Sequence, residues 1–151
     1  MWYLLIGAAV IIISFLREVK HYERGVVLTM GKFTGIREPG WSIIIPIFQR
    51  MKKVDMRVKA VDVPDQKVIT KDNVSASINA VIYYKVSDAA RATLVVENYF
   101  HAVSQLAQTT MRNIVGGAEL DEVLSQRDEL SARIQTIIDK ETDEWGITVE
   151  N

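Results

Sequence analysis

The N-terminus of the chain carries the strongest constraint on its fold, because no charged side chain occurs between Met1 and Leu16. As an α-helix rising about 1.5 Å per residue, this segment would be about 24 Å long. The hydrocarbon core of a bilayer is about 30 Å thick and usually takes about 20 residues. The segment therefore predicts a membrane anchor that is short for a span. It would cross only if Arg17 and Lys20 snorkel or the bilayer thins.

Two other placements of this segment stay open, namely insertion into the membrane without crossing and burial in a protein core. A cleaved signal peptide fits less well, because its basic residues would precede the apolar run. Here Arg17, Lys20 and Arg24 follow the run, so the positive-inside rule places the rest of the chain in the cytoplasm. The side chains predicted to anchor the chain in lipid are Trp2, Leu4, Leu5, Ile6, Val10, Ile11, Ile12, Ile13, Phe15 and Leu16.

Composition removes several kinds of chemistry from the rest of the chain. The sequence has no cysteine, which excludes disulfides, thiol catalysis and cysteine-ligated metals. Its two histidines, His21 and His101, are too few for a site built on several. The net charge of −1 argues against a nucleic-acid partner, which would favour a basic excess.

Motifs for catalysis are also missing from the sequence, including the nucleophile elbow, the zinc-protease helix and the P-loop. His101 and Ser104 are three residues apart on a predicted helix and could touch. Neither an orienting acid nor an oxyanion hole accompanies them, so they do not make a triad. Nothing in the sequence therefore requires an enzyme, and we assign no catalytic residue, no cofactor and no metal ion.

A second apolar stretch runs from Trp41 to Phe48 and is interrupted by Pro46. It is too short to cross a bilayer as a helix. One interpretation is a buried strand or loop. The other is a patch at the membrane interface, in which Trp41, Ile43, Ile45 and Phe48 contact lipid at headgroup depth. The sequence favours neither, because short apolar runs are ambiguous.

Charge is unevenly distributed along the chain. The segment 50–59 has a net charge of +4, whereas the segment 118–145 has a net charge of −6. Each segment is typical of a solvated face, but two functional interpretations compete with that one. A basic strand near an anchor attracts anionic headgroups, and opposite charges on two copies favour a head-to-tail contact. The predicted lipid-headgroup or oligomer contacts are Arg50, Lys52, Lys53 and Arg57.

Alternation of apolar and polar side chains predicts strands in the first half of the domain. The longest such strand spans 74–86, with Ile78 and Ile82 on the apolar face and Ser77 on the other. A shorter strand at 66–70 and turn residues at 71–73 precede it, which predicts an antiparallel hairpin. A valine-rich strand at 25–30, followed by a turn at Gly31–Lys32, is expected nearer the anchor.

The second half changes to helical periodicity. An apolar stripe predicts a helix from Tyr99 to Ile114, ended by the glycine pair 116–117. The S-x-x-D spacing of Ser125 and Asp128 predicts the start of another helix, which runs to Trp145. A strand then begins at 147–149. Because the chain ends at Asn151, just inside this strand, we expect it to be the N-terminal part of a longer protein.

Several short motifs of this chain resemble those of one family, in the same order. They are Y-E-R-G-V-V at 22–27, E-P-G-W at 38–41, K-V-D-M-R at 53–57, T-K-D-N-V at 70–74, V-I-Y-Y-K-V at 81–86, L-A-Q-T-T-M-R at 106–112 and W-G-I at 145–147. The chain from Lys20 to Asn151 thus resembles the stomatin-like (SPFH, Band 7, prohibitin-homology) family. The resemblance is strongest to its prokaryotic, slipin-type branch.

This resemblance implies a membrane anchor at residues 1–16 and an α+β SPFH domain at 17–151, with antiparallel strands packed by two or more helices. It also implies a coiled-coil helix that this chain does not contain. It implies a non-enzymatic scaffold that binds membrane lipid, forms a homo-oligomeric ring or cage and organises membrane microdomains. The alternative is a regulatory partner of a membrane-bound NfeD-type serine protease. The domain is expected on the cytoplasmic side of the plasma or inner membrane. One departure is that animal stomatins carry a longer, proline-kinked anchor.

Overall fold

A computed structural model of the chain describes residues 2–151, apart from the side chain of Leu4. The chain divides into two compact units, Met1–Arg57 and Val58–Asn151. Unit 1 begins with the helix α1 (Trp2–Phe15), as the apolar run predicts. Leu16, predicted to belong to the anchor, instead begins the first strand. Among the described residues, no helix is long and apolar enough to cross a membrane.

The remainder of unit 1, between residues 16 and 57, consists of two small antiparallel sheets. One sheet pairs β1 (Leu16–Val19) with β4 (Gly40–Ile43). The other has the order β3-β2-β5, built from β2 (Glu23–Thr29), β3 (Lys32–Arg37) and β5 (Gln49–Asp55). The predicted strand near the anchor is thus confirmed as β2. Its turn falls at Met30–Gly31, where φ is positive at both residues.

The core of unit 1 is made almost entirely of small branched side chains. Its buried apolar residues are Val19, Val26, Val27, Ile44 and Val54. Gly25 of β2 lies close to β5, since a Cβ at this position would be 2.5 Å from the sulfur of the Met51 side chain, which would have to move. This core is small, and it leaves many larger apolar side chains of unit 1 on the surface.

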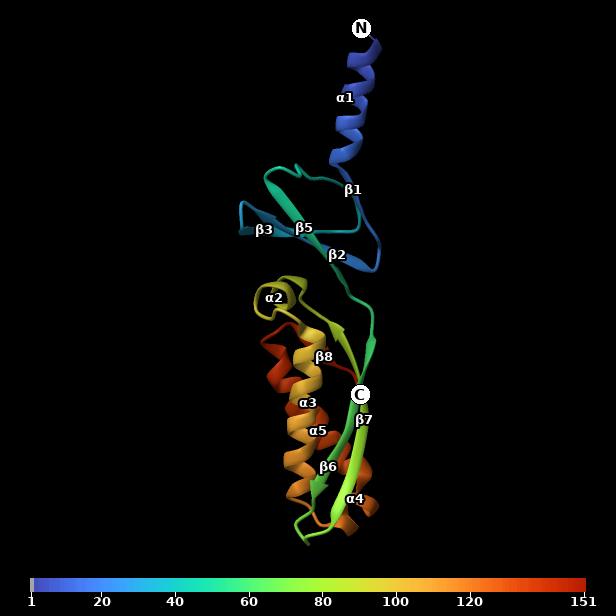
Figure 1. Cartoon of the computed structure of the whole chain (residues 1–151), viewed down its shortest axis with the longest axis vertical. Coiled ribbons are helices and arrows are strands. Elements are labelled where there is room, and N and C mark those ends of the chain that lie inside the picture. The colour runs from blue at the N-terminus through green and yellow to red at the C-terminus, as the bar shows by residue number, and fades with distance from the viewer. Residues whose placement is uncertain (1) are drawn as a thin grey trace. The chain divides into compact units, whose positions relative to one another are not determined.

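Unit 2 is an antiparallel sheet of order β6-β7-β8 covered by helices. Figure 1 shows α3 and α5 running beside the β6–β7 hairpin, and α3 contacts both β6 and α5. The elements of this unit are β6 (Lys59–Ile69), β7 (Ser75–Val86), α2 (Ala89–Leu94), α3 (Tyr99–Gly116), α4 (Leu120–Ser125), α5 (Arg127–Asp143) and β8 (Ile147–Val149). The α+β class, the hairpin and the last strand are confirmed.

The core of unit 2 follows the predicted alternation. Ile82, Tyr84 and Val86 of β7 are buried, whereas Ser75 and Ser77 are exposed. Ile78 is half-buried and packs on the edge of the core, so its prediction as a core residue holds only in part. The stripe of α3 contributes Val103, Ala107 and Met111, and α5 contributes Ile138.

The helix predicted after Ser125 is confirmed as α5, but the prediction that Ser125 and Asp128 cap its start is wrong. The hydroxyl of Ser125 donates to the carbonyl oxygen of Asp121 at 2.6 Å, which closes the last turn of α4. Gln126 precedes α5 and makes no side-chain capping bond. The capping box belongs to α4, where Glu119 and Glu122 satisfy each other's backbone N–H groups. The same S-x-x-D spacing therefore occurs here at a helix end.

Other boundaries differ for local reasons. β6 starts at Lys59 because the strand continues through a bulge between Val63 and Gln66, where Pro64 hides the alternation. α3 ends at Gly116, but Gly117 has φ −89° and does not use the left-handed conformation. The short elements β1, β3, β4, α2 and α4 carry too few residues for a periodic signal and were not predicted.

Candidate membrane interface

Helix α1 presents apolar side chains on every face. From Trp2 to Ser14, each described side chain is exposed, and none of them is charged. A helix that is apolar all round belongs in a protein core or a membrane. Among the described residues of the chain, none covers this apolar surface of α1.

The stretch from Trp41 to Phe48 turns its large side chains outward. Trp41 is 75% exposed, Ile43 70% and Ile47 80%, and Ile45 and Phe48 are also exposed. Ser42 and Ile44 alternate with them and are buried. The interpretation as a wholly buried strand or loop is therefore wrong, because only the alternate face meets the small core of unit 1. We call Trp41, Ile43, Ile45, Ile47 and Phe48 the apolar rim.

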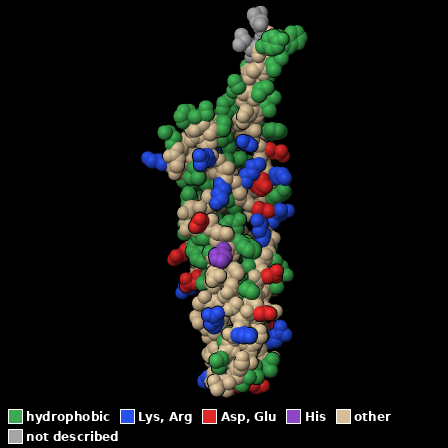
Figure 2. Space-filling model, in the orientation of Figure 1, with side chains coloured by type: hydrophobic (Ala, Val, Ile, Leu, Met, Phe, Trp, Pro, Cys, Tyr) green, Lys and Arg blue, Asp and Glu red, His purple; other side chains and the backbone are tan. Residues whose placement is uncertain are grey.

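Backbone hydrogen bonds join the apolar rim to the end of α1. Leu16 pairs with Ile43 across β1 and β4. One residue further, the N–H of Ile44 donates to the carbonyl oxygen of Phe15 at 2.9 Å. The helix and the rim are consequently held together at this junction. Figure 2 shows hydrophobic side chains along α1 and over the adjoining strands of unit 1.

The rim has a defined backbone although part of it is a loop. The carbonyl oxygen of Ile45 accepts from the N–H groups of Phe48 at 3.1 Å and Gln49 at 2.8 Å. The side-chain oxygen of Gln49 accepts from the N–H of Ile45 at 3.3 Å. The N–H of Met30, itself exposed at the β2–β3 turn, donates to the carbonyl oxygen of Phe48 at 2.8 Å. These bonds fix the exposed side chains on a folded surface.

The four predicted headgroup or oligomer contacts divide into different environments. Arg57 donates to both carboxylate oxygens of Asp55, with its Nη2 2.8 Å from Oδ2, and its guanidinium lies 4.2 Å from the centre of the Tyr22 ring. The hydrogen bond to Asp55, followed by the charge of that carboxylate, raises the pKa of Arg57. This guanidinium is thus engaged within unit 1.

The other three basic residues lie on β5 and are exposed. The ammonium of Lys53 donates to the carbonyl oxygen of Glu18 on β1 at 2.6 Å. A pocket of about 480 Å³ brings Arg50 and Lys53 together with Arg17, whereas Lys52 does not line it. From the sequence, Arg17 was interpreted only as a basic residue that follows the anchor. Its position directly after the apolar run could have indicated a headgroup contact.

Comparison with known proteins identifies the domain. The family model described as SPFH domain / Band 7 family matches residues 17–151. This chain belongs to the SPFH/Band 7 family. A stomatin homolog of Pyrococcus horikoshii is 47% identical over 97% of this chain and 55% of its own length. Stomatin-2 of Caenorhabditis elegans is 41% identical over 99% of this chain and 40% of its own length.

A further relative of this SPFH domain is a protein of Archaeoglobus fulgidus, which is 52% identical over 98% of the chain and 61% of its own length. The chain thus spans about half the length of these curated relatives, from 40% to 61%. Two of the family motifs seen in the sequence make structural contacts at turns of this domain.

The T-K-D-N-V motif of the SPFH domain closes the β6–β7 hairpin. The hydroxyl of Thr70 donates to the carboxylate of Asp72, and its oxygen accepts from the N–H of Val74 at 3.2 Å. The Asp72 carboxylate also accepts from the N–H of Leu120 at 3.2 Å, at the start of α4. The bond from Thr70 is the main cause that lowers the pKa of Asp72. This motif therefore ties the hairpin turn to a helix.

The W-G-I motif positions β8 in the same way. Gly146 has φ +69°, and a Cβ there would lie 2.7 Å from the carbonyl oxygen of Asp88. Its own carbonyl oxygen accepts from the N–H groups of Ser87 at 2.8 Å and Asp88 at 3.0 Å. Only glycine fits this close approach of two backbone segments.

The residues with potential for chemistry do not come together in the SPFH domain. His101 is exposed on the first turn of α3, where its backbone N–H donates to the side chain of Asn98. The hydroxyl of Ser104 accepts from the side chain of Gln108 at 3.4 Å. Within residues 2–151, no group of three or more histidine, cysteine or acidic residues is arranged to hold a metal ion.

Proposed function

We propose that this SPFH domain is the membrane-bound part of an oligomeric scaffold that organises membrane microdomains. The observation that supports the proposal is the exposed apolar surface of α1, which continues through the Phe15–Ile44 hydrogen bond into the apolar rim. Burying one large apolar side chain contributes about 1.5–3 kcal/mol. A surface with this many exposed apolar side chains favours a lipid environment over water.

The depth of the two parts differs in this proposal. Helix α1 enters the hydrocarbon region, because it contains no charged side chain. The apolar rim lies at the interface, where Trp41 matches the preference of aromatic rings for headgroup depth. Arg17 and the basic strand β5 then face anionic headgroups on the cytoplasmic side, as the positive-inside rule favours.

The scaffold proposal further requires contacts between copies. The acidic segment 118–145 and the basic strand β5 carry opposite charges, which suits a head-to-tail contact that closes into a ring or cage. Family membership supports the scaffold role in general terms. The alternative carried over from the family resemblance is a regulatory partner of a membrane-bound NfeD-type serine protease.

Membrane extraction tests the anchoring step. The wild-type chain should stay in the membrane pellet after alkaline carbonate washing, and deletion of residues 2–15 should release most of it. A residual bound fraction of the deletion variant should fall as salt rises, because exposed charges are screened. Release of the wild-type chain by carbonate alone would contradict the proposed membrane anchoring.

Micrographs of native membranes distinguish the two functional candidates. Rings or cages of the protein would support the scaffold. A protein without such assemblies, purified together with a membrane serine protease whose activity depends on it, would favour the regulatory partner instead.

A further inference from the structure

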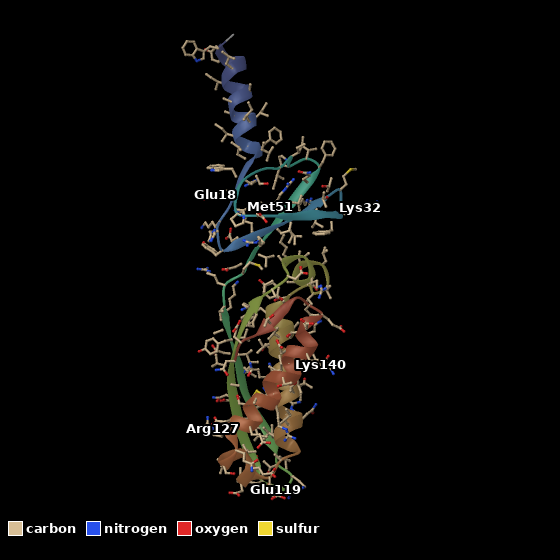
Figure 3. The ribbon with its side chains drawn as sticks, turned by 180° about the vertical axis from the view of Figure 1, so that it is seen from behind. Glu18, Lys32, Met51, Glu119, Arg127 and Lys140 are labelled. Carbon is tan, nitrogen blue, oxygen red and sulfur yellow. The ribbon has the colours of Figure 1, made fainter. Side chains whose placement is uncertain are left out.

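Beside the end of α1, unit 1 contains a pocket with a strongly basic lining. Its volume is about 480 Å³, and its cations are Arg17 from β1 and Arg50 and Lys53 from β5. Figure 3 labels Glu18 on β1 and Met51 on β5, which mark the two strands concerned. The bond from Lys53 to the Glu18 carbonyl oxygen joins these strands directly. The pocket is therefore part of the folded unit.

The charge of this pocket is not neutralised by its surroundings. No acidic side chain lines it among the described residues. Within residues 2–151, no ion pair or side-chain hydrogen bond engages Arg17 or Arg50. A guanidinium presents paired N–H donors that match phosphate oxygens. Two guanidinium groups and one ammonium group consequently form a site suited to an anion.

The walls of the pocket indicate the kind of anion. Ile44 and Pro46 line it, and both belong to the segment that carries the apolar rim. Arg17 follows directly on the residue that ends the apolar run. If the rim and α1 lie in the membrane, the pocket opens at the depth of lipid phosphates. A phosphodiester carries one negative charge, whereas a phosphate monoester carries about −1.5 to −2 at pH 7. Three cations suit the monoester better.

We propose that this pocket binds the phosphate monoester headgroup of an anionic phospholipid, of which phosphatidic acid is the simplest. This inference rests on the proposed membrane anchoring. The basic side chains of β5 then have different roles: Arg50 and Lys53 bind one headgroup, and Lys52 lies outside the pocket.

The test is a lipid-retention measurement on the full chain. The protein is reconstituted in nanodiscs of phosphatidylcholine containing equal amounts of phosphatidic acid and phosphatidylglycerol, then extracted in mild detergent. Native mass spectrometry counts the lipids that stay bound. We expect one phosphatidic acid per protomer, because its monoester headgroup carries more negative charge than a phosphodiester. Its preference over phosphatidylglycerol should be at least about fivefold, equivalent to about 1 kcal/mol.

Matched variants separate the pocket from general charge. Arg50→Gln and Arg17→Gln should each lower the preference about fivefold. Lys52→Gln removes the same charge from the same strand and should leave the preference unchanged. Circular dichroism checks that all three fold. Equal retention of the two lipids, or an equal loss in Lys52→Gln and Arg50→Gln, would overturn the pocket proposal.

Two further outcomes locate the source of a failure. Wild-type protein that does not enter phosphatidylcholine nanodiscs overturns both this inference and the membrane anchoring. Protein that enters them without preferring phosphatidic acid overturns the pocket alone. Glycerol 3-phosphate, added at the concentration of the lipid, should not displace it. Full displacement would assign the pocket to soluble phosphates and overturn the lipid assignment.

Discussion

At the scale of single residues, burial and neighbouring groups determine the ionisation of side chains in this domain. Tyr84 is 1% exposed, lies 6.3 Å from the Tyr99 ring centre in an edge-on arrangement, and has a buried hydroxyl without a hydrogen-bond partner among the described residues. Desolvation raises the pKa of Tyr84 to about 12. Arg57 shows the opposite case, since a charged group near the surface is held by Asp55 and by the Tyr22 ring.

The raised pKa of Tyr84 predicts a loss of stability in alkali. Between about pH 10, the ordinary value for tyrosine, and about 12 in the folded state, the folded chain keeps a proton that the unfolded chain loses. Unfolding is therefore favoured as the pH rises through this window. Urea melts from pH 7 to pH 11 should show a steeper loss for the wild type than for Tyr84→Phe. Parallel curves for the two proteins would contradict this assignment.

At pH 7, Tyr84→Phe should be neutral or slightly stabilising, because it removes a buried hydroxyl that lacks a partner. Tyr83 provides the matched control. It is the preceding residue on β7, and its side chain is exposed. The Tyr83→Phe variant should therefore lose stability in alkali as the wild type does.

At the scale of elements, pairing determines which periodic faces are covered. The β6–β7 hairpin meets α3 on one face, so the alternation of β7 divides into buried and exposed positions. In unit 1, β4 has the same alternation, but its larger side chains are on the uncovered face. The two strands differ because only β7 has a helix packed against its apolar side.

The alternation of β7 makes a direct prediction. Ile82 is 5% exposed, and Ile82→Asp would bury a charge without a partner, which should cost several kcal/mol of unfolding free energy. Ser77→Asp should be tolerated, because Ser77 is exposed and lies opposite Lys67 on β6. Thermal melts of both variants decide the point. Equal destabilisation by the two changes would mean that the faces are assigned wrongly.

At the scale of the whole molecule, the basic strand β5 takes part both in the proposed lipid contact and in the proposed contact between copies. The apolar surface and the basic pocket belong to unit 1, whereas the acidic residues of 118–145 belong to unit 2. Self-association by the proposed head-to-tail contact needs opposite charges on different copies, and it should depend on ionic strength.

Assembly should therefore respond to both charge and salt. In detergent or nanodiscs, the wild-type chain should sediment above the monomer mass at low salt and shift toward the monomer as salt rises. At low salt, Lys52→Glu should weaken association relative to the wild type, because it reverses an exposed charge on β5. Lys52 lies outside the pocket, so the variant leaves the pocket lining intact. Lys140→Glu is the control. It makes the same change of charge within the acidic segment (Figure 3) and should not weaken association. Sedimentation of the wild-type chain as a monomer at every salt concentration would contradict the proposed head-to-tail contact.

The sequence by itself determined the elements whose signal is local and repeated. The uncharged run predicted α1, the two-residue alternation predicted β7, and the apolar stripe predicted α3. Family motifs added the α+β domain, and the comparisons confirmed the family. These features could be predicted because each depends on side chains that are near one another along the chain.

The tertiary structure decided what depends on distant partners. Sequence left the placement of Trp41–Phe48 open, because burial depends on whether another layer covers each face, and here only the face with Ile44 is covered. The sequence alone grouped Arg57 with the other basic residues as a headgroup or oligomer contact. In the structure, its guanidinium is paired with Asp55. The sequence did not join Arg17 to Arg50 and Lys53, because these residues are more than thirty positions apart in the sequence and only the folding of unit 1 brings them to one pocket.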